Sequence, residues 1–170
     1  MTNNDGATKG DGAKEIVDGL DRRTKIRLLS GSGMFQVRGL PEHGLDPIDV
    51  SDGPHGLRHQ SRGGDHLGVG GSNPATCFPT AATLGSTWDV ELVEQVGVAL
   101  GEEAAAQGVA VILGPGLNIK RHPAGGRSFE YLSEDPLLSG KLAGAMVRGI
   151  QSQGIGACLK HYAVNNHESH

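Results

Sequence analysis

The alternation of short apolar runs with helical periodicity predicts a parallel α/β fold for this chain of 170 residues. From the N-terminus the order is strand, strand, helix, strand, loop, helix, strand. Residues 109–113 (VAVIL) contain no polar residue, which is typical of a strand covered on both faces of a parallel sheet. Polar residues cluster directly after the strands, where parallel α/β proteins place their functional groups.

The first third of the chain holds few regular segments. Residues 1–14 are polar, rich in glycine and without periodicity, and we expect them to form a disordered tail. Residues 15–29 place apolar side chains at helical spacing and predict a helix, whereas residues 30–44 hold several glycines and predict a loop. Residues 47–51 alternate in polarity and predict the first strand, which ends at Asp52 because Gly and Pro follow.

The middle of the chain becomes regular only after a long polar stretch. Residues 55–76 are rich in Gly, His and Arg and predict a loop, and residues 78–84 predict a short strand. Ser86 and Asp89 are spaced like an N-cap and its acidic partner. They precede residues 90–107, whose apolar side chains recur at helical spacing and predict a helix.

The last third repeats the alternation of strand and helix. After the strand at 109–113, residues 137–153 predict a second helix and residues 155–164 a further strand-like run. Residues 114–136 form a long segment between them, and a loop of more than about 15 residues in a compact domain is more often functional than structural. About four strands result, whereas a complete eight-stranded barrel needs about 250 residues. We therefore expect an incomplete α/β domain.

The composition excludes several classes of protein. Lys and Arg number 15 against 19 Asp and Glu, and the net charge of −4 carries no signature of nucleic-acid or membrane binding. No apolar run reaches the roughly 18 residues that span a bilayer, and the N-terminal residues lack the apolar segment of a secretory signal. Cys77 and Cys158 stand far apart and outside metal-ligand spacing, so we expect reduced thiols in a cytoplasmic protein.

Four charged or titratable residues follow predicted strands or lie in the long loop: Asp52, Arg127, Lys160 and His161. Together they offer charge-assisted donors and an acceptor that suit the hydroxyl groups of a neutral sugar. They do not suit phosphate transfer, because no glycine-rich phosphate loop follows any strand. Taken singly, each has a structural interpretation: Asp52 as a turn residue, Arg127 as a solvated loop residue, and Lys160 with His161 as a strand end that meets water.

Four segments, in this order, resemble glycoside hydrolase family 3 and its β-glucosidase-type members. They are SDGPHGLR at 51–58, FPTAATLGSTWD at 78–89, GPGLNIKRHPAGGRSFEYLSEDP at 114–136 and KHYAVNNHES at 160–169. The resemblance covers residues 28–170. It implies the first half of a TIM-type (β/α)8 barrel over residues 15–170, cut short in this chain, in an enzyme that binds a small carbohydrate and uses no metal or organic cofactor.

The resemblance also implies a reaction and a set of sugar contacts. Members of the family are retaining exo-glycosidases, commonly for terminal β-linked glucose, and their contacts to the terminal sugar carry over to Asp52, Arg127, Lys160 and His161. The family's nucleophilic aspartate and its acid/base glutamate match no segment here, so we expect both beyond residue 170. Retaining hydrolysis needs two such carboxyl groups about 5–5.5 Å apart, and we therefore expect the 170-residue chain alone to be inactive.

Other interpretations stay open at this point. The chain could be a non-catalytic sugar-binding fragment, a β-xylosidase-type member of the same family, or a complete small enzyme that uses Glu134 or Asp135. The segment KHYAVNNHES lacks the Pro-Gly-His-Gly pattern of the family's hexosaminidases. We expect Glu130, Glu134 and Asp135 to pair with basic side chains or cap a helix, Trp88 to pack in the core, and His122 and His167 to face solvent or the pocket rim without binding a metal.

Overall fold

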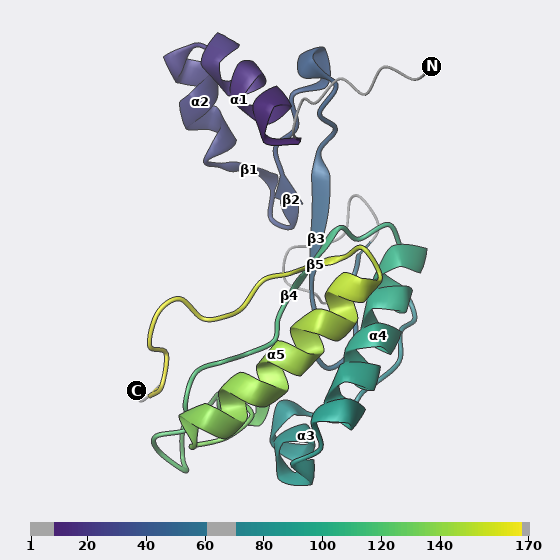
Figure 1. Cartoon of the computed structure of the whole chain (residues 1–170), viewed down its shortest axis with the longest axis vertical. Helices are drawn as coiled ribbons and strands as arrows, with labels where there is room; N and C mark the ends of the chain where they lie inside the picture. Colours follow the sequence, from purple (N-terminus) through teal and green to yellow (C-terminus); the bar gives the residue numbers. More distant parts are fainter. Residues whose placement is uncertain (1–8, 61–70, 168–170) are drawn as a thin grey trace, which may run out of the picture. The chain divides into compact units, whose positions relative to one another are not determined.

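A computed structural model describes residues 9–60 and 71–167 of the chain. The chain divides into two compact units, Met1–Ile48 and Asp49–His170 (Figure 1). None of the helices among the described residues has the length and apolar character that crossing a membrane requires.

The first unit begins with two helices where one was predicted. Helix α1 spans Lys9–Gly19 and helix α2 spans Arg22–Leu28. They are separate because Asp21 caps α2, accepting a hydrogen bond from the Thr24 amide at 2.6 Å. The expected disordered tail is wrong for residues 9–14, which are helical; the rest of that tail, residues 1–8, lies outside the described residues. An ion pair one helical turn apart, between Lys14 and Asp18, stabilises α1.

A short antiparallel hairpin replaces the loop predicted at residues 30–44. Strand β1 (Gly31–Gly33) pairs with β2 (Gln36–Val37), and a 3-10 turn, η1, follows at Pro41–His43. The Arg38 guanidinium holds the base of the hairpin, donating to the carbonyl of Gly31 at 3.0 Å. Strand β1 is Gly-Ser-Gly and β2 has only two residues, so neither forms a run of β-branched or aromatic residues that would predict a strand.

The second unit is built on three parallel strands, which confirms the predicted fold class. They are β3 (Ile48–Asp52), β4 (Val111–Leu113) and β5 (Gly156–Ala157), with Asp52 opposite Leu113 and Ile112 opposite Ala157. The strand-like run predicted at residues 155–164 is regular for only two residues. Backbone pairing nevertheless continues, because the Lys160 amide donates to Pro115 at 3.2 Å and the Leu117 amide donates to Lys160 at 2.7 Å.

Two long helices pack against each other beside the sheet, as Figure 1 shows. They are α4 (Val90–Ala106) and α5 (Pro136–Ser152), close to the predicted ranges. Their axes approach closely because glycines face the contact: a Cβ atom on Gly97 would lie 2.5 Å from the Met146 carbonyl oxygen. Side chains from the helices and from β4 are fully buried in one core, among them Val93, Leu100, Ile112, Leu142 and Ile150.

Two local predictions in the middle of the chain are wrong. Residues 78–84 do not form a strand; a short helix, α3 (Ala81–Thr87), begins after Thr80, whose hydroxyl accepts from the Thr83 amide. Asp89 rather than Ser86 caps α4, because the Asp89 carboxylate accepts from the Leu92 amide at 2.9 Å. A proline followed by a threonine begins a helix as readily as it interrupts a strand. The described part of the loop predicted at 55–76 has no helix; residues 61–70 lie outside the described residues.

Candidate functional site

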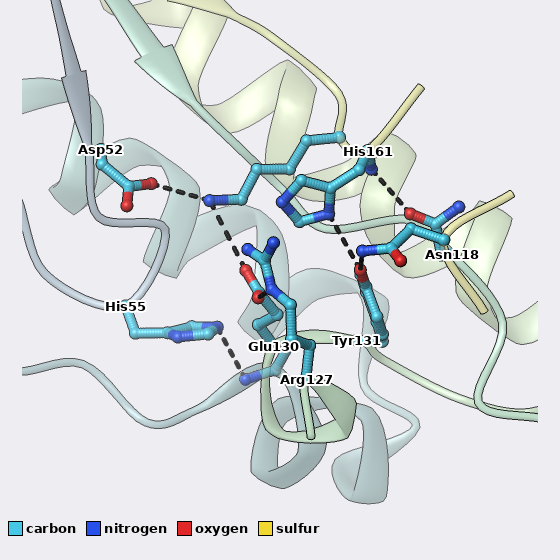
Figure 2. A network of polar contacts seen from close by, with 10 residues as sticks. Asp52, His55, Asn118, Arg127, Glu130, Tyr131 and His161 are labelled. Atoms are coloured by element: carbon cyan, nitrogen blue, oxygen red, sulfur yellow. Dashed lines mark hydrogen bonds and ion pairs between the residues drawn. The ribbon is translucent and has the colours of Figure 1, made fainter. Parts of the chain in front are cut away.

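The carboxyl ends of the parallel strands bring most of the predicted site residues together (Figure 2). Asp52 is the last residue of β3, and Lys160 follows β5 by a few residues. Arg127 and Glu130 come from the long loop after β4, at a 3-10 turn, η2 (Ser128–Glu130). Parallel strands place their carboxyl ends at one edge of the sheet, so residues far apart in the sequence meet there.

Lys160 lies at the centre of a chain of charges. Its Nζ donates to Asp52 Oδ1 at 2.7 Å and lies 3.5 Å from Glu130 Oε2. On the other side of Glu130, the Nε of Arg127 donates to Oε1. Two carboxylates and two cations therefore alternate, and their formal charges sum to zero. Such a set suits an uncharged, hydroxyl-rich ligand better than an anion.

The two carboxylates differ sharply in exposure. The Glu130 side chain is 5% exposed, whereas that of Asp52 is 43% exposed. Burial acts to raise the pKa of Asp52, but the hydrogen bond and the charge of Lys160, with smaller help from the Gly53 amide and Arg127, outweigh it. The net result is a lowered pKa, so Asp52 is an ionised acceptor at neutral pH.

His161 is oriented by neighbours from two other segments. Its ring Nδ1 lies 2.9 Å from the Tyr131 hydroxyl, with the two rings edge to face at 5.9 Å, and Asn165 donates to the same hydroxyl at 3.1 Å. The backbone amide of His161 donates to Asn118 Oδ1 at 2.6 Å, and the Lys160–His161 peptide is cis. Tyr131 is 3% exposed, so it is a fixed support for the imidazole ring.

His55 joins the site to the start of α3. Its Nε2 accepts from the Ala81 amide at 2.9 Å, and its ring lies edge-on to Phe129 with centroids 6.2 Å apart. Burial is the main reason why the pKa of His55 is lowered; the charge of Lys160 adds to this, against the carboxylates of Glu130 and Asp52. His55 is therefore neutral near neutral pH, with Nε2 as the acceptor.

The structure thus brings together the four residues predicted from the sequence. Asp52, Arg127 and Lys160 form one network, and His161 follows Lys160 directly in the chain. Two structural expectations for acidic residues of the long loop are confirmed. Glu130 pairs with basic side chains, and Asp135 caps α5, accepting from the amides of Leu137 and Leu138 at 3.1 Å each. Sequence reasoning did not single out Tyr131, His55 and Asn118; their only signal is their place inside the matching segments.

Trp88 is not in the core, contrary to prediction. It is 74% exposed, because α3 ends at Thr87 and Trp88 leaves the helix in a left-handed conformation with φ of 57°. His122 and His167 are exposed and stack on each other at 5.3 Å. Within the described residues, no group of His, Cys, Asp and Glu is arranged to hold a metal ion, and the thiols of Cys77 and Cys158 are free and exposed.

A hollow of about 550 Å³ adjoins the network on the side of Lys160 and His161. Its walls are mainly apolar and come from the segments after β4 and β5, including Leu117, Leu159 and Val164. Asp52, Arg127 and Glu130 do not line it. The charged network and this hollow are therefore neighbouring features that share Lys160.

Charged residues gathered at the carboxyl ends of parallel strands define a class of α/β domain, one that carries its functional groups at that edge of the sheet. The family described as "Glycosyl hydrolase family 3 N terminal domain" matches residues 62–170. The chain belongs to this family.

The relatives are enzymes that act on glycosides. The chain is 50% identical to Thermostable beta-glucosidase B of Acetivibrio thermocellus over 155 residues, which are 91% of this chain and 20% of that protein. It is 48% identical to an Exo-alpha-(1->6)-L-arabinopyranosidase of Bifidobacterium breve over 154 residues, 90% of this chain and again 20% of the relative. The chain thus spans a fifth of the length of these curated relatives.

Solved structures confirm the fold. Beta-glucosidase 3B from Thermotoga neapolitana, in complex with glucose, superposes with a TM-score of 0.82 at 41% identity, covering 92% of this chain and 24% of that one. A beta-glucosidase from Kluyveromyces marxianus with glucose bound gives a TM-score of 0.84 at 37% identity, covering 91% of this chain and 18% of the other. The second unit is accordingly part of a TIM-type barrel.

Proposed function

We propose that the chain supplies the contacts to the terminal sugar in a retaining exo-glycosidase that hydrolyses terminal β-D-glucosidic bonds. The observation that carries the proposal is the neutral network of Asp52, Lys160, Glu130 and Arg127 at the carboxyl ends of the strands. In this proposal Asp52, Arg127, Lys160 and His161 bind the hydroxyl groups of the sugar. The proposal also includes the domain limits, with residues 15–170 in the barrel domain.

Each proposed contact has a defined chemistry. Asp52 accepts hydrogen bonds from sugar hydroxyls through its half-exposed carboxylate, while Lys160 and Arg127 donate. His161 presents the ring edge opposite the nitrogen that contacts Tyr131. The side chains of the network are already held by one another, so they lose little conformational entropy when a sugar binds. The network therefore favours a sugar in one orientation.

Bond cleavage requires groups that we place outside this chain. Retaining hydrolysis uses a carboxylate nucleophile and a carboxylic acid about 5–5.5 Å apart, with a covalent glycosyl-enzyme intermediate. Glu130 is paired with two cations and buried, and Asp135 is engaged as the cap of α5. The capping role speaks against the small-enzyme interpretation for Asp135. We propose that the 170-residue chain alone is inactive.

A second candidate is a pentopyranosidase. The relative from Bifidobacterium breve, named as an arabinopyranosidase, is nearly as similar as the glucosidase relative. Xylose and arabinopyranose lack the hydroxymethyl group of glucose but keep ring hydroxyls that the same four residues can bind. A cytoplasmic location stays a prediction from the cysteine usage.

Titration calorimetry of the chain tests the proposal. We expect binding of glucose and of gluconolactone, weakened at least about tenfold in Asp52→Asn, because one charge-assisted hydrogen bond contributes about that factor. Lys141→Met, on the exposed face of α5, is the matched surface control. Equal affinities of wild type and Asp52→Asn for glucose would contradict the proposed site, and preferential binding of xylose would favour the pentopyranosidase.

A further inference from the structure

We propose that Glu130 determines which sugars the site accepts: by neutralising and positioning Arg127 and Lys160, it makes the site select uncharged sugars over acidic ones. The inference rests on the proposed function, because it concerns the ligand of the same site. Glu130 is a positioning residue, since it acts through the two cations and not by touching the ligand.

The exposure of the two carboxylates supports this division of roles. Asp52 and Glu130 both contact the Nζ of Lys160, but only Asp52 is open to solvent, at 43% against 5% for Glu130. Both oxygens of Glu130 are engaged, Oε1 by Arg127 and Oε2 by Lys160. The Arg127 side chain is 35% exposed and its bond to Glu130 is made through Nε, the inner nitrogen of the guanidinium. Glu130 thus supports the cations from the protein side.

Local structure fixes Glu130 in this position. The 3-10 turn η2 has about three residues per turn, so residues three apart, Arg127 and Glu130, project on the same side. The Glu130 amide donates to the Arg127 carbonyl at 3.2 Å, which closes the turn. On the other side, Gly116 lies so close that a Cβ there would overlap the Glu130 carbonyl oxygen. The backbone of Glu130 is therefore fixed at its amide and at its carbonyl, and this fixes the start of the side chain that carries the carboxylate.

The charge balance gives the specificity. With Glu130 present, two negative and two positive charges sum to zero. With Glu130→Gln, one carboxylate remains against two cations, and the site carries a formal charge of about +1 in partly buried surroundings, where charge interactions are stronger than in water. A carboxylate on the sugar would then supply the missing anion. We therefore expect glucuronate to gain affinity relative to glucose, while Asp52 and Lys160 still offer the same polar groups to the ring hydroxyls.

The test uses the whole chain and two variants of Glu130. Affinities for glucose and for glucuronate are measured by titration calorimetry in wild type, Glu130→Gln and Glu130→Asp. We expect Glu130→Gln to raise the ratio of glucuronate to glucose affinity by at least about tenfold. Glu130→Asp keeps the charge but shortens the side chain, so glucose binds more weakly while the ratio stays as in wild type. Glu94→Gln, which removes an exposed partner of Arg148, is the matched control and changes neither.

A readout that needs no sugar separates this inference from the proposed function. The rate at which an amine-reactive ester labels Lys160 is followed by peptide mass spectrometry, with exposed Lys141 as the internal reference. Faster labelling of Lys160 in Glu130→Gln supports the positioning role of Glu130, whether or not wild type binds either sugar. If wild type binds neither sugar, the proposed function is refuted but the positioning role is not. An unchanged labelling rate, an unchanged affinity ratio in Glu130→Gln, or a raised ratio in Glu130→Asp overturns the inference.

Discussion

Replacing Lys160 with methionine removes the central cation of the network and leaves a side chain of similar length. The variant loses a 2.7 Å hydrogen bond to Asp52 and a 3.5 Å contact with Glu130, while Glu130 keeps Arg127. A hydrogen bond to a charged group contributes about 1.5–3 kcal/mol, and the 43% exposure of Asp52 puts the value at the lower end. We expect a loss of about 1.5–2 kcal/mol, which lowers Tm by about 3–8 °C for a chain of this size.

The pH dependence of this loss is the sharper test. In the wild type the pKa of Asp52 is lowered in the folded state, so its stabilising contribution is present above its ordinary value of 3.8 and is lost as the pH falls through the lowered pKa. Lys160→Met takes away the main group that lowers this pKa and leaves the burial that raises it. The Tm difference between wild type and variant is therefore largest at neutral pH and shrinks in acid.

Differential scanning calorimetry at neutral pH and below the ordinary pKa of Asp52 measures both quantities. Lys141→Met is the control, because Lys141 is exposed on α5, away from the network. A Tm difference that is the same at both pH values would refute the assignment of Lys160 as the partner of an ionised Asp52. Equal Tm values for wild type and Lys160→Met at neutral pH would refute the ion pair itself.

Three further changes test other parts of the structure. Gly97→Ala places a Cβ 2.5 Å from a carbonyl oxygen of α5 and should destabilise the chain by about 1–3 kcal/mol in chemical denaturation, whereas Gly140→Ala, with open space around it, should be neutral or stabilising. The pKa of His55 is lowered in the folded state, so the stability of the chain should fall as the pH drops below the ordinary value of 6.5. His55→Gln should flatten this dependence of Tm on pH in thermal melts. A dependence unchanged by the substitution would contradict the buried neutral imidazole. Tyr131→Phe removes the hydroxyl at His161 and should cost about 1 kcal/mol and weaken glucose binding in calorimetry, and wild-type values for both would show that the hydroxyl does not orient the ring.

Local signals in the sequence were sufficient for the longer elements. Helices α4 and α5 repeat apolar residues at helical spacing and end where predicted to within a residue or two, and β4 is an unbroken apolar run. Strand β5 was overestimated: the apolar residues Leu159 and Val164 that follow it are exposed, so the apolar run indicated neither burial nor a regular backbone. Strands β1 and β2 were missed, since their pairing depends on backbone hydrogen bonds and on Arg38.

In the site, too, some residues have a local signal in the sequence and others do not. Asp52, Arg127, Lys160 and His161 stand in segments that the sequence marks clearly, and their meeting follows from the parallel arrangement of the strands. The supporting residues are set by contacts between distant segments: Tyr131 is 30 residues from His161, and Asn118 is 43 residues from it. Hydrophobic periodicity and turn chemistry carry no information on such pairs, so these residues emerge only from the folded chain.

The central claim is that sugar hydroxyls bind at the charged network on the carboxyl ends of β3 and β5. A crystal structure of the chain with glucose tests it most directly. We predict the sugar within hydrogen-bonding distance of Asp52, Lys160 and Arg127, with the imidazole of His161 at its edge. Glucose bound elsewhere, for example only in the apolar hollow beside Leu159 and Val164, would contradict the claim.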